Sequence, residues 1–394
     1  MNITQLKDEF INRFGEGNAP IRFFTSPGRV NLIGEHTDYN GGYVLPAAIT
    51  LATTVAVRQR NDNLIRLAAT DLDVLVEADI NKIEEYKQIE WGNYQLGVVS
   101  ELQKAGYDIT GLDMLYHDTV PHGSGLSSSA AIEVATALCF ASYSNEKNGV
   151  LEPIDMKQMA IIGQKAENNY VGVACGIMDQ FASAMGKRDH AVFLDCSNLS
   201  YRMIPISLKD ESIIISNTNK KRSLIVSKYN ERRAECEKGL AALKTVIKDI
   251  DFLADVCVED FEKHKHVIGD ETIIKRVEHV VYECDRVKRS AEALSGGDIL
   301  LFGKLMNLSH TSLRDLYEVT GDELDTLADA AWGVEGCIGS RMTGAGFGGC
   351  TVSIVKNSCI DEFKEKVSRY YEEKMGYAPS FYVTKAGDGG REIK

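Results

Sequence analysis

The chain has 394 residues, of which 44% are hydrophobic and 26% are charged, and its formal net charge is −13. This length exceeds the size at which one hydrophobic core stops growing, so it predicts two domains. The composition is typical of a soluble globular protein. The acidic balance argues against a nucleic-acid or anionic-membrane partner, although a locally positive site could still bind an anionic substrate.

The cysteines and the N-terminus indicate the compartment. Nine cysteines are scattered without Cys-x-x-Cys spacing, which argues against a disulfide framework and against a zinc site. Residues 1–12 lack the apolar segment of a signal peptide, and no window approaches the length of a membrane span. We therefore expect a cytoplasmic protein, a monomer without an obligate protein partner.

The first half of the chain is predicted to contain both helices and strands. Apolar spacing and turn residues predict, in chain order, a helix over 3–14, strands over 21–24, 30–33, 43–58 (bent at Pro46), 64–68 and 74–78, a helix over 91–103, a strand over 111–118, a helix after Ala131 through Phe140, helices over 155–169 and 180–185, and strands over 191–195, 201–206 and 212–216.

A domain boundary is predicted in the connection 207–210, which divides the chain into residues 1–207 and 208–394. The second part is rich in helices and ends in a polar tail. Its predicted elements are helices over 227–246, 273–294, 299–317, 323–333 and 360–375, and strands over 350–355 and 381–384.

The first stretch that carries chemistry is Ser26–Gly42. Arg29 precedes an apolar run over 30–33, which reads as a half-buried strand, and a Glu35-His36-Thr37-Asp38 cluster follows it. The glycine turns on either side of the cluster could aim these polar groups at one point. Taken alone, a surface hairpin with ordinary turn chemistry explains the stretch equally well.

The second stretch, Pro121–Ala131, leads from a strand into a helix and reads Pro-His-Gly-Ser-Gly-Leu-Ser-Ser-Ser-Ala-Ala. Free backbone N–H groups and the helix dipole attract an anion, and glycines let it approach the backbone. A serine N-cap is the simpler alternative, but it requires neither the glycines nor two more hydroxyls. We therefore expect a phosphate cradle, although not a Walker A loop, formed by Gly123, Ser124, Gly125, Leu126, Ser127, Ser128 and Ser129.

The third stretch, Gly344–Gly349, formally matches G-x-G-x-x-G. A dinucleotide site needs a strand before this loop and a helix after it, whereas here a strand follows, so we expect a loop between a helix and a strand. The protein-kinase triplets His-Arg-Asp and Asp-Phe-Gly and the Gly-x-Ser-x-Gly elbow are all absent. Nicotinamide enzymes, protein kinases and α/β-hydrolases are therefore disfavoured.

A phosphate cradle together with spare carboxylates predicts phosphoryl transfer. That reaction needs a magnesium ion with hard oxygen ligands, a cation on the moving charge and a positioned nucleophile. Magnesium takes only one or two protein oxygens, so Ser129 and Glu167 would suffice. Arg29 would neutralise the transferring group, and Asp179 would hold the acceptor hydroxyl. Asp179 could instead merely charge the first turn of its helix.

These motifs together resemble the GHMP small-molecule kinases. The segment Gly28–Tyr39, with the wording Gly-Arg-Val-Asn-Leu-Ile-Gly-Glu-His-Thr-Asp-Tyr, is similar to the galactokinase signature of that family. Gly176–Phe181 and Tyr229–Arg233 match the same signature. The motifs run from residue 26 to residue 349 and so cover nearly the whole chain. Ser124 stands where the family more often has alanine or glycine.

The resemblance implies a fold and an activity. The fold is α+β, with an N-terminal domain like domain 2 of ribosomal protein S5 and a ferredoxin-like C-terminal domain, the site lying between them. The activity is ATP-dependent phosphorylation of the C1 hydroxyl of α-D-galactose in the Leloir pathway, so galactose and ATP are the expected partners.

The resemblance also implies roles for single residues. Arg29 and Asp179 correspond to the catalytic pair, and Mg²⁺ would be held by a serine of the second motif, for which we take Ser129, and by Glu167. Trp91 and Tyr94 correspond to part of an adenine pocket, although a Trp–Tyr pair is more often core. The sugar contacts are expected from a set of polar residues and one backbone segment, namely Glu35, His36, Asp38, Tyr229 and Gly176.

Three alternatives remain open at this point. The nearest is a kinase of the same family that acts on another sugar, such as N-acetylgalactosamine or arabinose. A mevalonate-type or homoserine-type kinase is less favoured because of the Glu35-His36-Thr37-Asp38 cluster. A sugar sensor without turnover is disfavoured because the cradle, Arg29 and Asp179 are all intact.

Overall fold

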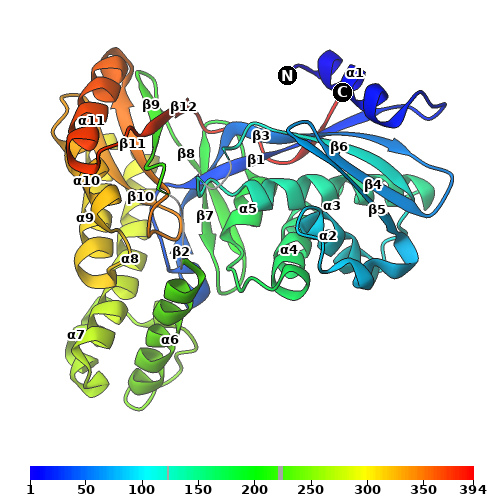
Figure 1. Cartoon of the computed structure of the whole chain (residues 1–394). Coiled ribbons are helices and arrows are strands. Elements are labelled where there is room, and N and C mark those ends of the chain that lie inside the picture. The colour runs from blue at the N-terminus through cyan, green and yellow to red at the C-terminus, as the bar shows by residue number, and fades with distance from the viewer. Residues whose placement is uncertain (122–123, 221–224) are drawn as a thin grey trace.

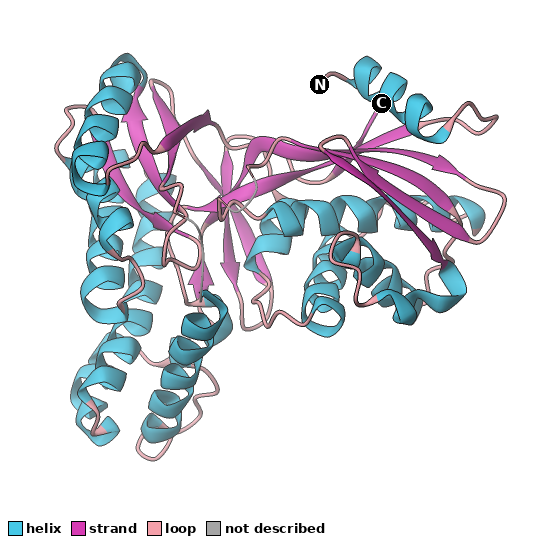
Figure 2. Ribbon diagram, in the orientation of Figure 1, coloured by secondary structure: helices cyan, strands magenta, loops and turns pink. Residues whose placement is uncertain are grey.

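The chain forms two halves on either side of a small central sheet (Figure 1). The structure is a computed structural model that describes residues 1–121, 124–220 and 225–394. Both termini lie on the first half, in which a large sheet is covered by helices, whereas the second half is mostly helical (Figure 2).

The helices of the described residues are α1 (Ile3–Phe14), α2 (Asn93–Lys104), α3 (Ser128–Lys147), α4 (Met156–Ala166), α5 (Met178–Met185), α6 (Ile225–Leu243), α7 (Val258–His264), α8 (Glu271–Ser295), α9 (Ile299–Ser312), α10 (Asp322–Trp332) and α11 (Ile360–Met375). Within residues 1–121, 124–220 and 225–394, none of them is both long and apolar enough to cross a membrane.

The strands are β1 (Arg22–Asn31), β2 (Tyr43–Val44), β3 (Pro46–Gln59), β4 (Leu64–Ala69), β5 (Leu72–Asp79), β6 (Leu112–Asp118), β7 (His190–Asp195), β8 (Ser200–Pro205), β9 (Glu211–Asn217), β10 (Cys337–Thr343), β11 (Cys350–Lys356), β12 (Ser380–Thr384) and β13 (Arg391–Ile393). They form a six-stranded sheet in the order β13-β1-β3-β6-β4-β5, a four-stranded sheet β10-β11-β9-β12 and a three-stranded sheet β2-β7-β8.

The layers confirm the predicted α+β class. Helices α2 to α5 cover one face of the six-stranded sheet, and α1 covers part of the other (Figure 2). In that sheet only β4 and β6 run parallel, and the four-stranded sheet is antiparallel throughout. Helices α9 to α11 pack on the four-stranded sheet, and α6 and α7 pack against α8. Mostly antiparallel sheets with helices segregated to one face define this class.

One apolar core joins the two halves and contains the first motif. Val30 and Leu32 pack there with Phe302 and Val352 of the second half, and all four are fully buried. The prediction of a half-buried strand over 30–33 was therefore wrong, because the run is covered on both sides. Residues 22–31 form one strand, and a bulge between Pro27 and Arg29 accommodates the proline, which lacks a ladder donor.

Most predicted elements are confirmed within a few residues, but the C-terminal part differs in three places. The third glycine loop connects β10 to β11, so it does not lie between a helix and a strand as predicted. The polar sequence of β10 concealed this strand, because its polar side chains are buried. The expected polar tail contains β13, which pairs with β1 through the backbone and needs no apolar pattern. Helix α7 was also missed.

The predicted boundary lies in the connection from β8 of the central sheet to β9 of the second half. Strand β13 then returns the chain to the first sheet, beside β1. The division into residues 1–207 and 208–394 stays a prediction.

The shared core makes a prediction about stability. We expect Phe302→Ala to lower the free energy of unfolding by about 3–5 kcal/mol, because Phe302 is 0% exposed in the core between the halves. Leu300→Ala is the matched control on the same helix, and its effect should stay within about 0.5 kcal/mol, since Leu300 is 64% exposed. Urea denaturation measures both values, and equal losses would contradict a core at this position.

Candidate active site

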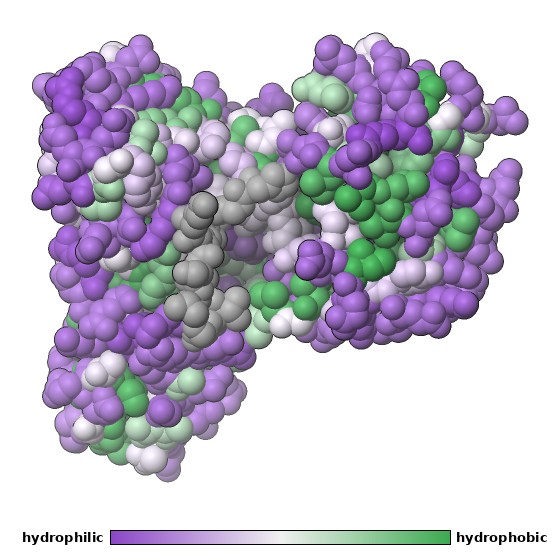
Figure 3. All heavy atoms as spheres, in the orientation of Figure 1, coloured by the Kyte–Doolittle hydropathy of each residue, from purple (hydrophilic) through white to green (hydrophobic). Residues whose placement is uncertain are grey.

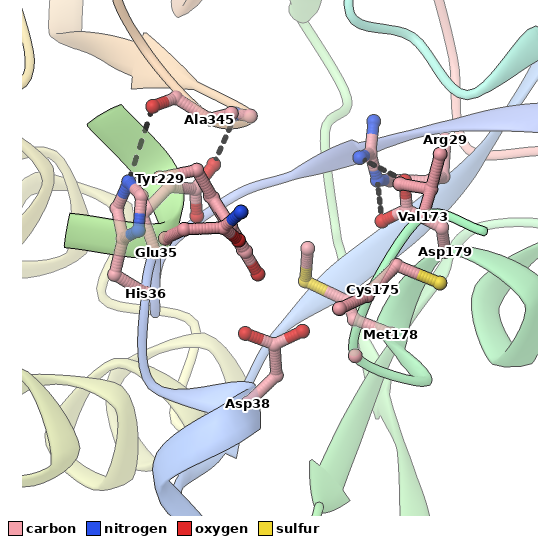
Figure 4. A pocket seen from close by; sticks show the side chains of 14 residues that line it. Arg29, Glu35, His36, Asp38, Val173, Cys175, Met178, Asp179, Tyr229 and Ala345 are labelled. Carbon is pink, nitrogen blue, oxygen red and sulfur yellow. Dashed lines mark hydrogen bonds and ion pairs between the residues drawn. The ribbon is translucent and has the colours of Figure 1, made fainter. Parts of the chain in front are cut away.

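A cavity of about 210 Å³ lies between the first motif, α5 and α6 (Figure 4). It is smaller than the roughly 300–1,000 Å³ of pockets for drug-sized ligands, so it suits a smaller molecule. All seven residues predicted for catalysis and sugar binding line it. The lining residues are Arg29, Glu35, His36, Asp38, Val173, Ala174, Cys175, Gly176, Met178, Asp179, Tyr229, Asn230, Gly344 and Ala345.

Arg29 and Asp179 form a bidentate ion pair at the edge of this cavity. Arg29 Nε donates to Asp179 Oδ1 at 2.8 Å, and the second guanidinium nitrogen donates to Oδ2 at 2.5 Å. The Arg29 side chain is 5% exposed and the Asp179 side chain 31% exposed, so Asp179 is the more open partner of the pair. Asp179 lies in the first turn of α5, where a carboxylate can interact with the positive end of the helix dipole. Because its carboxylate also binds Arg29, that interaction is not its only role.

Arg29 also fixes the second motif. Its backbone N–H donates to the carbonyl of Leu126 at 3.0 Å, and its third guanidinium nitrogen donates to the carbonyl of Gly125 at 2.7 Å. A Cβ at Gly28 would lie 2.5 Å from the same Leu126 oxygen, so the two segments can approach this closely only because residue 28 is glycine. Ser127 Oγ donates to Asp179 Oδ2 at 2.5 Å. The ion pair therefore joins the first motif, the second motif and α5.

Asp38 projects into the cavity from the turn after β1 (Figure 4). Burial, reinforced by the nearby charge of Asp179, raises the pKa of Asp38 to about 6. A Cβ at Gly176 would lie 1.8 Å from Asp38 Oδ2. Gly176, predicted as a backbone contact, is thus the residue that gives the Asp38 carboxylate its room.

Glu35 is buried and binds the third glycine loop. Its Oε1 accepts a hydrogen bond from the backbone N–H of Gly344 at 2.6 Å, and its Oε2 accepts from Asn31 and lies 3.3 Å from a guanidinium nitrogen of Arg341. Burial raises the pKa of Glu35, and the Arg341 charge and the Gly344 N–H oppose this effect. Glu35 therefore links β1 and β10 as well as lining the cavity.

His36 uses both ring nitrogens within the protein. Nε2 lies 3.2 Å from the carbonyl oxygen of Ala345, which can only accept, so Nε2 carries the hydrogen. Nδ1 then accepts from the Tyr39 hydroxyl at 2.9 Å. Burial lowers the pKa of His36 to about 3, so the ring is neutral. The ring packs beside Tyr229, with 5.6 Å between ring centroids, and neither of its nitrogens is without a partner.

The second motif does not form a serine N-cap. Ser127 has a left-handed φ of 61° and its side chain makes no capping hydrogen bond. Ser128 Oγ is bound to Asp118, whereas the side chain of Ser129 makes no hydrogen bond with the described residues. The Ser124 side chain is buried and donates to the Pro121 carbonyl, and Leu126 belongs to the core. Gly125 has a φ of 82°. Gly123 lies outside the described residues.

A second cavity of about 400 Å³ adjoins the start of α3. The predicted adenine residues Trp91 and Tyr94 line it, and so do Ser128 and Ser129. Ser127 touches Asp179 at the first cavity, so the three serines run from one cavity to the other. The face in Figure 3 is hollowed between the halves, with apolar residues on the side of the six-stranded sheet.

One predicted metal ligand, Ser129, is among these serines, and the other, Glu167, follows the end of α4. Burial, with the charge of Asp179, raises the pKa of Glu167 to about 7. Residues 1–121, 124–220 and 225–394 contain no group of three or more histidines, cysteines or carboxylates that could hold a metal. A site of two protein oxygens, Ser129 and Glu167, fits magnesium, which keeps several waters.

Several supporting residues were not predicted. Arg341, which is 0% exposed, donates to the carbonyl of Asn31 at 3.0 Å, and Glu283 accepts from the N–H of Gly34 at 3.0 Å. Tyr317 hydrogen-bonds Tyr39 at 2.8 Å. These residues come from the second half and hold the first motif from behind. An arginine two positions before Thr343 was the only signal in the sequence.

Comparisons with known proteins agree with this geometry. Residues 8–59 match the galactokinase galactose-binding signature, residues 93–187 match the GHMP kinases N terminal domain, and residues 290–373 match the GHMP kinases C terminal domain. The chain is 49% identical to a galactokinase of Clostridium tetani over 393 residues, covering 100% of this chain and 98% of the relative. It is 46% identical to a galactokinase of Bacillus subtilis, covering 99% of each.

Solved structures show the same relationship. Lactococcus lactis galactokinase complexed with galactose has a TM-score of 0.93 and 42% identity, covering 99% of this chain and 100% of that one. The mevalonate kinase of Methanococcus jannaschii, at 19% identity and a TM-score of 0.65, shares the fold. The fold and the glycine-loop site thus define a GHMP kinase. Within that group, the chain belongs to the galactokinase family.

The burial of Asp38 makes a prediction about pH. The folded-state pKa of about 6 lies above the ordinary value of 3.8, so ionisation of Asp38 destabilises the fold. We expect Asp38→Asn to raise the free energy of unfolding by about 1–3 kcal/mol at neutral pH. The gain should be absent below about pH 4, grow up to about pH 6 and stay constant above it.

Urea denaturation across this pH range measures the effect. Asp210→Asn, at an exposed position, is the control and should change stability at no pH. A loss of stability in Asp38→Asn at neutral pH would show that the carboxylate makes a net stabilising contact instead.

Proposed function

We propose that the chain transfers the γ-phosphoryl group of ATP to the C1 hydroxyl of α-D-galactose, a reaction that feeds the Leloir pathway. The observation that carries this proposal is the Arg29–Asp179 ion pair, which stands where the acidic cavity meets the serine-rich start of α3. An acceptor hydroxyl and a phosphate can meet only at such a junction. The galactokinase relatives and the galactose complex of the Lactococcus lactis enzyme support the choice of sugar.

The 210 Å³ cavity is the proposed sugar site. Asp38 and Glu35 supply carboxylate oxygens, each of which can accept directional hydrogen bonds from sugar hydroxyls. Tyr229 supplies a phenol, and the backbone at Gly176 lies against Asp38. His36 contributes its ring edge, because its nitrogens are already bound to Tyr39 and Ala345.

Asp179 orients the acceptor hydroxyl and accepts its proton. The carboxylate accepts hydrogen bonds from Arg29 and Ser127, so its direction is fixed before the sugar arrives. A loose transition state requires little early deprotonation, so orientation comes first and proton transfer follows. The Arg29 guanidinium stabilises the charge that develops on the phosphoryl oxygens.

The nucleotide lies across the second cavity and the start of α3 in this proposal. Trp91 and Tyr94 line the 400 Å³ cavity as an adenine site, and the helix start with Ser127 to Ser129 faces the phosphates. Magnesium, when bound by Ser129 and Glu167, would neutralise the phosphate charge. The hydroxyls of Ser127 and Ser128 are already bound to Asp179 and Asp118. The Ser129 hydroxyl makes no hydrogen bond with the described residues, which supports Ser129 as the magnesium ligand.

We further propose that the enzyme works as a monomer in the cytoplasm, without a nucleic-acid or membrane partner. No disulfide joins the cysteines of the described residues, which suits a reducing compartment.

A conservative substitution tests the role of Asp179. We expect Asp179→Asn to lower kcat by about 10²–10⁴-fold, because the amide cannot accept the proton although it fills the same space. The KM for galactose should change much less if the hydroxyl still binds. A coupled ADP-release assay measures both constants.

Ser183→Ala on the same helix is the control, since this hydroxyl is buried without a hydrogen-bond partner among the described residues. Near-normal turnover by a folded Asp179→Asn enzyme would remove the base role and leave only orientation.

A further inference from the structure

A buried polar cluster lies behind Glu167, where α3, α4 and α5 meet. The side chain of Gln180 on α5 is fully buried, and its Nε2 donates to Glu167 Oε2 at 2.8 Å and to Glu133 Oε2 at 2.9 Å. The same nitrogen lies 4.0 Å from Cys175 Sγ. With its NH₂ end facing Glu133 and Glu167, Gln180 has one amide hydrogen for each of the two carboxylates.

The two hydrogen bonds of Gln180 form a bridge between Glu133 and Glu167, and a glycine on the neighbouring helix leaves space for this bridge. Gly163 on α4 lies against both side chains: a Cβ at this position would be 3.1 Å from Gln180 Cγ and 3.3 Å from Glu133 Cβ. Any larger residue at position 163 would press on Gln180 and Glu133 together. The bridge is therefore held on one side by a neighbouring helix and on the other by Glu133 of α3.

Stability alone does not explain these residues. The remaining oxygens, Glu133 Oε1 and Gln180 Oε1, are buried without a hydrogen-bond partner among the described residues. A buried polar atom without a partner costs about 1–3 kcal/mol, so apolar side chains of similar size would give a more stable core. Sites that keep such a cost are commonly functional.

We propose that Gln180 is a positioning residue that fixes Glu167 to receive a divalent cation, and that Glu133 holds Gln180 in the required orientation. Gln180 holds Oε2 of Glu167, so the other oxygen, Oε1, takes no part in the bridge and would be the oxygen offered to the cation. This inference rests on the proposed function, in which Ser129 and Glu167 bind magnesium. Loss of such an outer partner typically weakens metal binding by about 10–100-fold.

The test measures metal binding directly. Gln180→Met keeps the volume of the side chain and removes both donors. Binding of Mn²⁺ to the full chain with a non-hydrolysable ATP analogue is followed by electron paramagnetic resonance. We expect the Mn²⁺ dissociation constant and the Mg²⁺ concentration for half-maximal ADP release each to rise by about 10–100-fold, with the KM for galactose within about twofold of the wild type.

A pair of substitutions at Glu133 gives a second, independent readout. Glu133→Gln keeps an acceptor for Gln180 and should bind Mn²⁺ nearly as the wild type does, whereas Glu133→Met removes the acceptor and should behave like Gln180→Met. Gln158→Met, at a half-buried site on α4, controls for the exchange itself. If Gln180→Met does not fold, the two Glu133 variants decide the question.

Wild-type Mn²⁺ binding in Gln180→Met or Glu133→Met would overturn the proposal, even if their melting temperature falls. Glu167→Ala separates this failure from failure of the proposed metal site. If Glu167→Ala loses Mn²⁺ and Gln180→Met does not, only the positioning role is wrong. If Glu167→Ala binds Mn²⁺ normally, the metal site itself is wrong, and the positioning role falls with it.

Discussion

The ion pair between Arg29 and Asp179 is the interaction on which the site depends. Arg29 donates hydrogen bonds from its backbone N–H and from all three guanidinium nitrogens, to the loop before α3 and to the carboxylate on α5. Three segments that are far apart in the sequence are thereby fixed at one point. The bulge at Pro27 and the missing side chain at Gly28 are the local features that allow this approach. A carboxylate held in this way needs little reorganisation when a substrate arrives.

The same region concentrates negative charge. Burial and mutual repulsion raise the pKa values of Asp38 and Glu167 to about 6 and about 7, and they also raise the pKa of Glu133. Such a cluster destabilises the fold, and in the proposed function hydroxyl donors and a divalent cation would offset this cost. Two residues of the second half stabilise the first motif: Arg341 forms an ion pair with Glu35, and Glu283 accepts a hydrogen bond from the N–H of Gly34. The buried carboxylates at the site thus lower the stability of the fold, and the contacts of Arg341 and Glu283 behind the site raise it.

The sequence predicted the fold class, and it singled out residues that line one cavity, because motifs and hydrophobic periods are local signals. Arg29, Asp38 and Asp179 stand beside glycines and prolines that mark special backbone. It could not reveal that His36 has no free nitrogen, because that depends on Ala345, more than 300 residues away. Strand β10 and the bridge by Gln180 were missed for a related reason: buried polar residues resemble surface residues until their partners are known.

The most direct test of the account is an acceptor panel with Mg-ATP, in which ADP release is measured for galactose, glucose, N-acetylgalactosamine, arabinose, mevalonate and homoserine, and the product is identified by phosphorus NMR. The account predicts phosphorylation at C1 of galactose with a kcat/KM at least about 100-fold above every other acceptor. Preference for another acceptor would contradict the assignment of the sugar cavity. Sugar binding without ADP release would contradict the roles of Arg29 and Asp179.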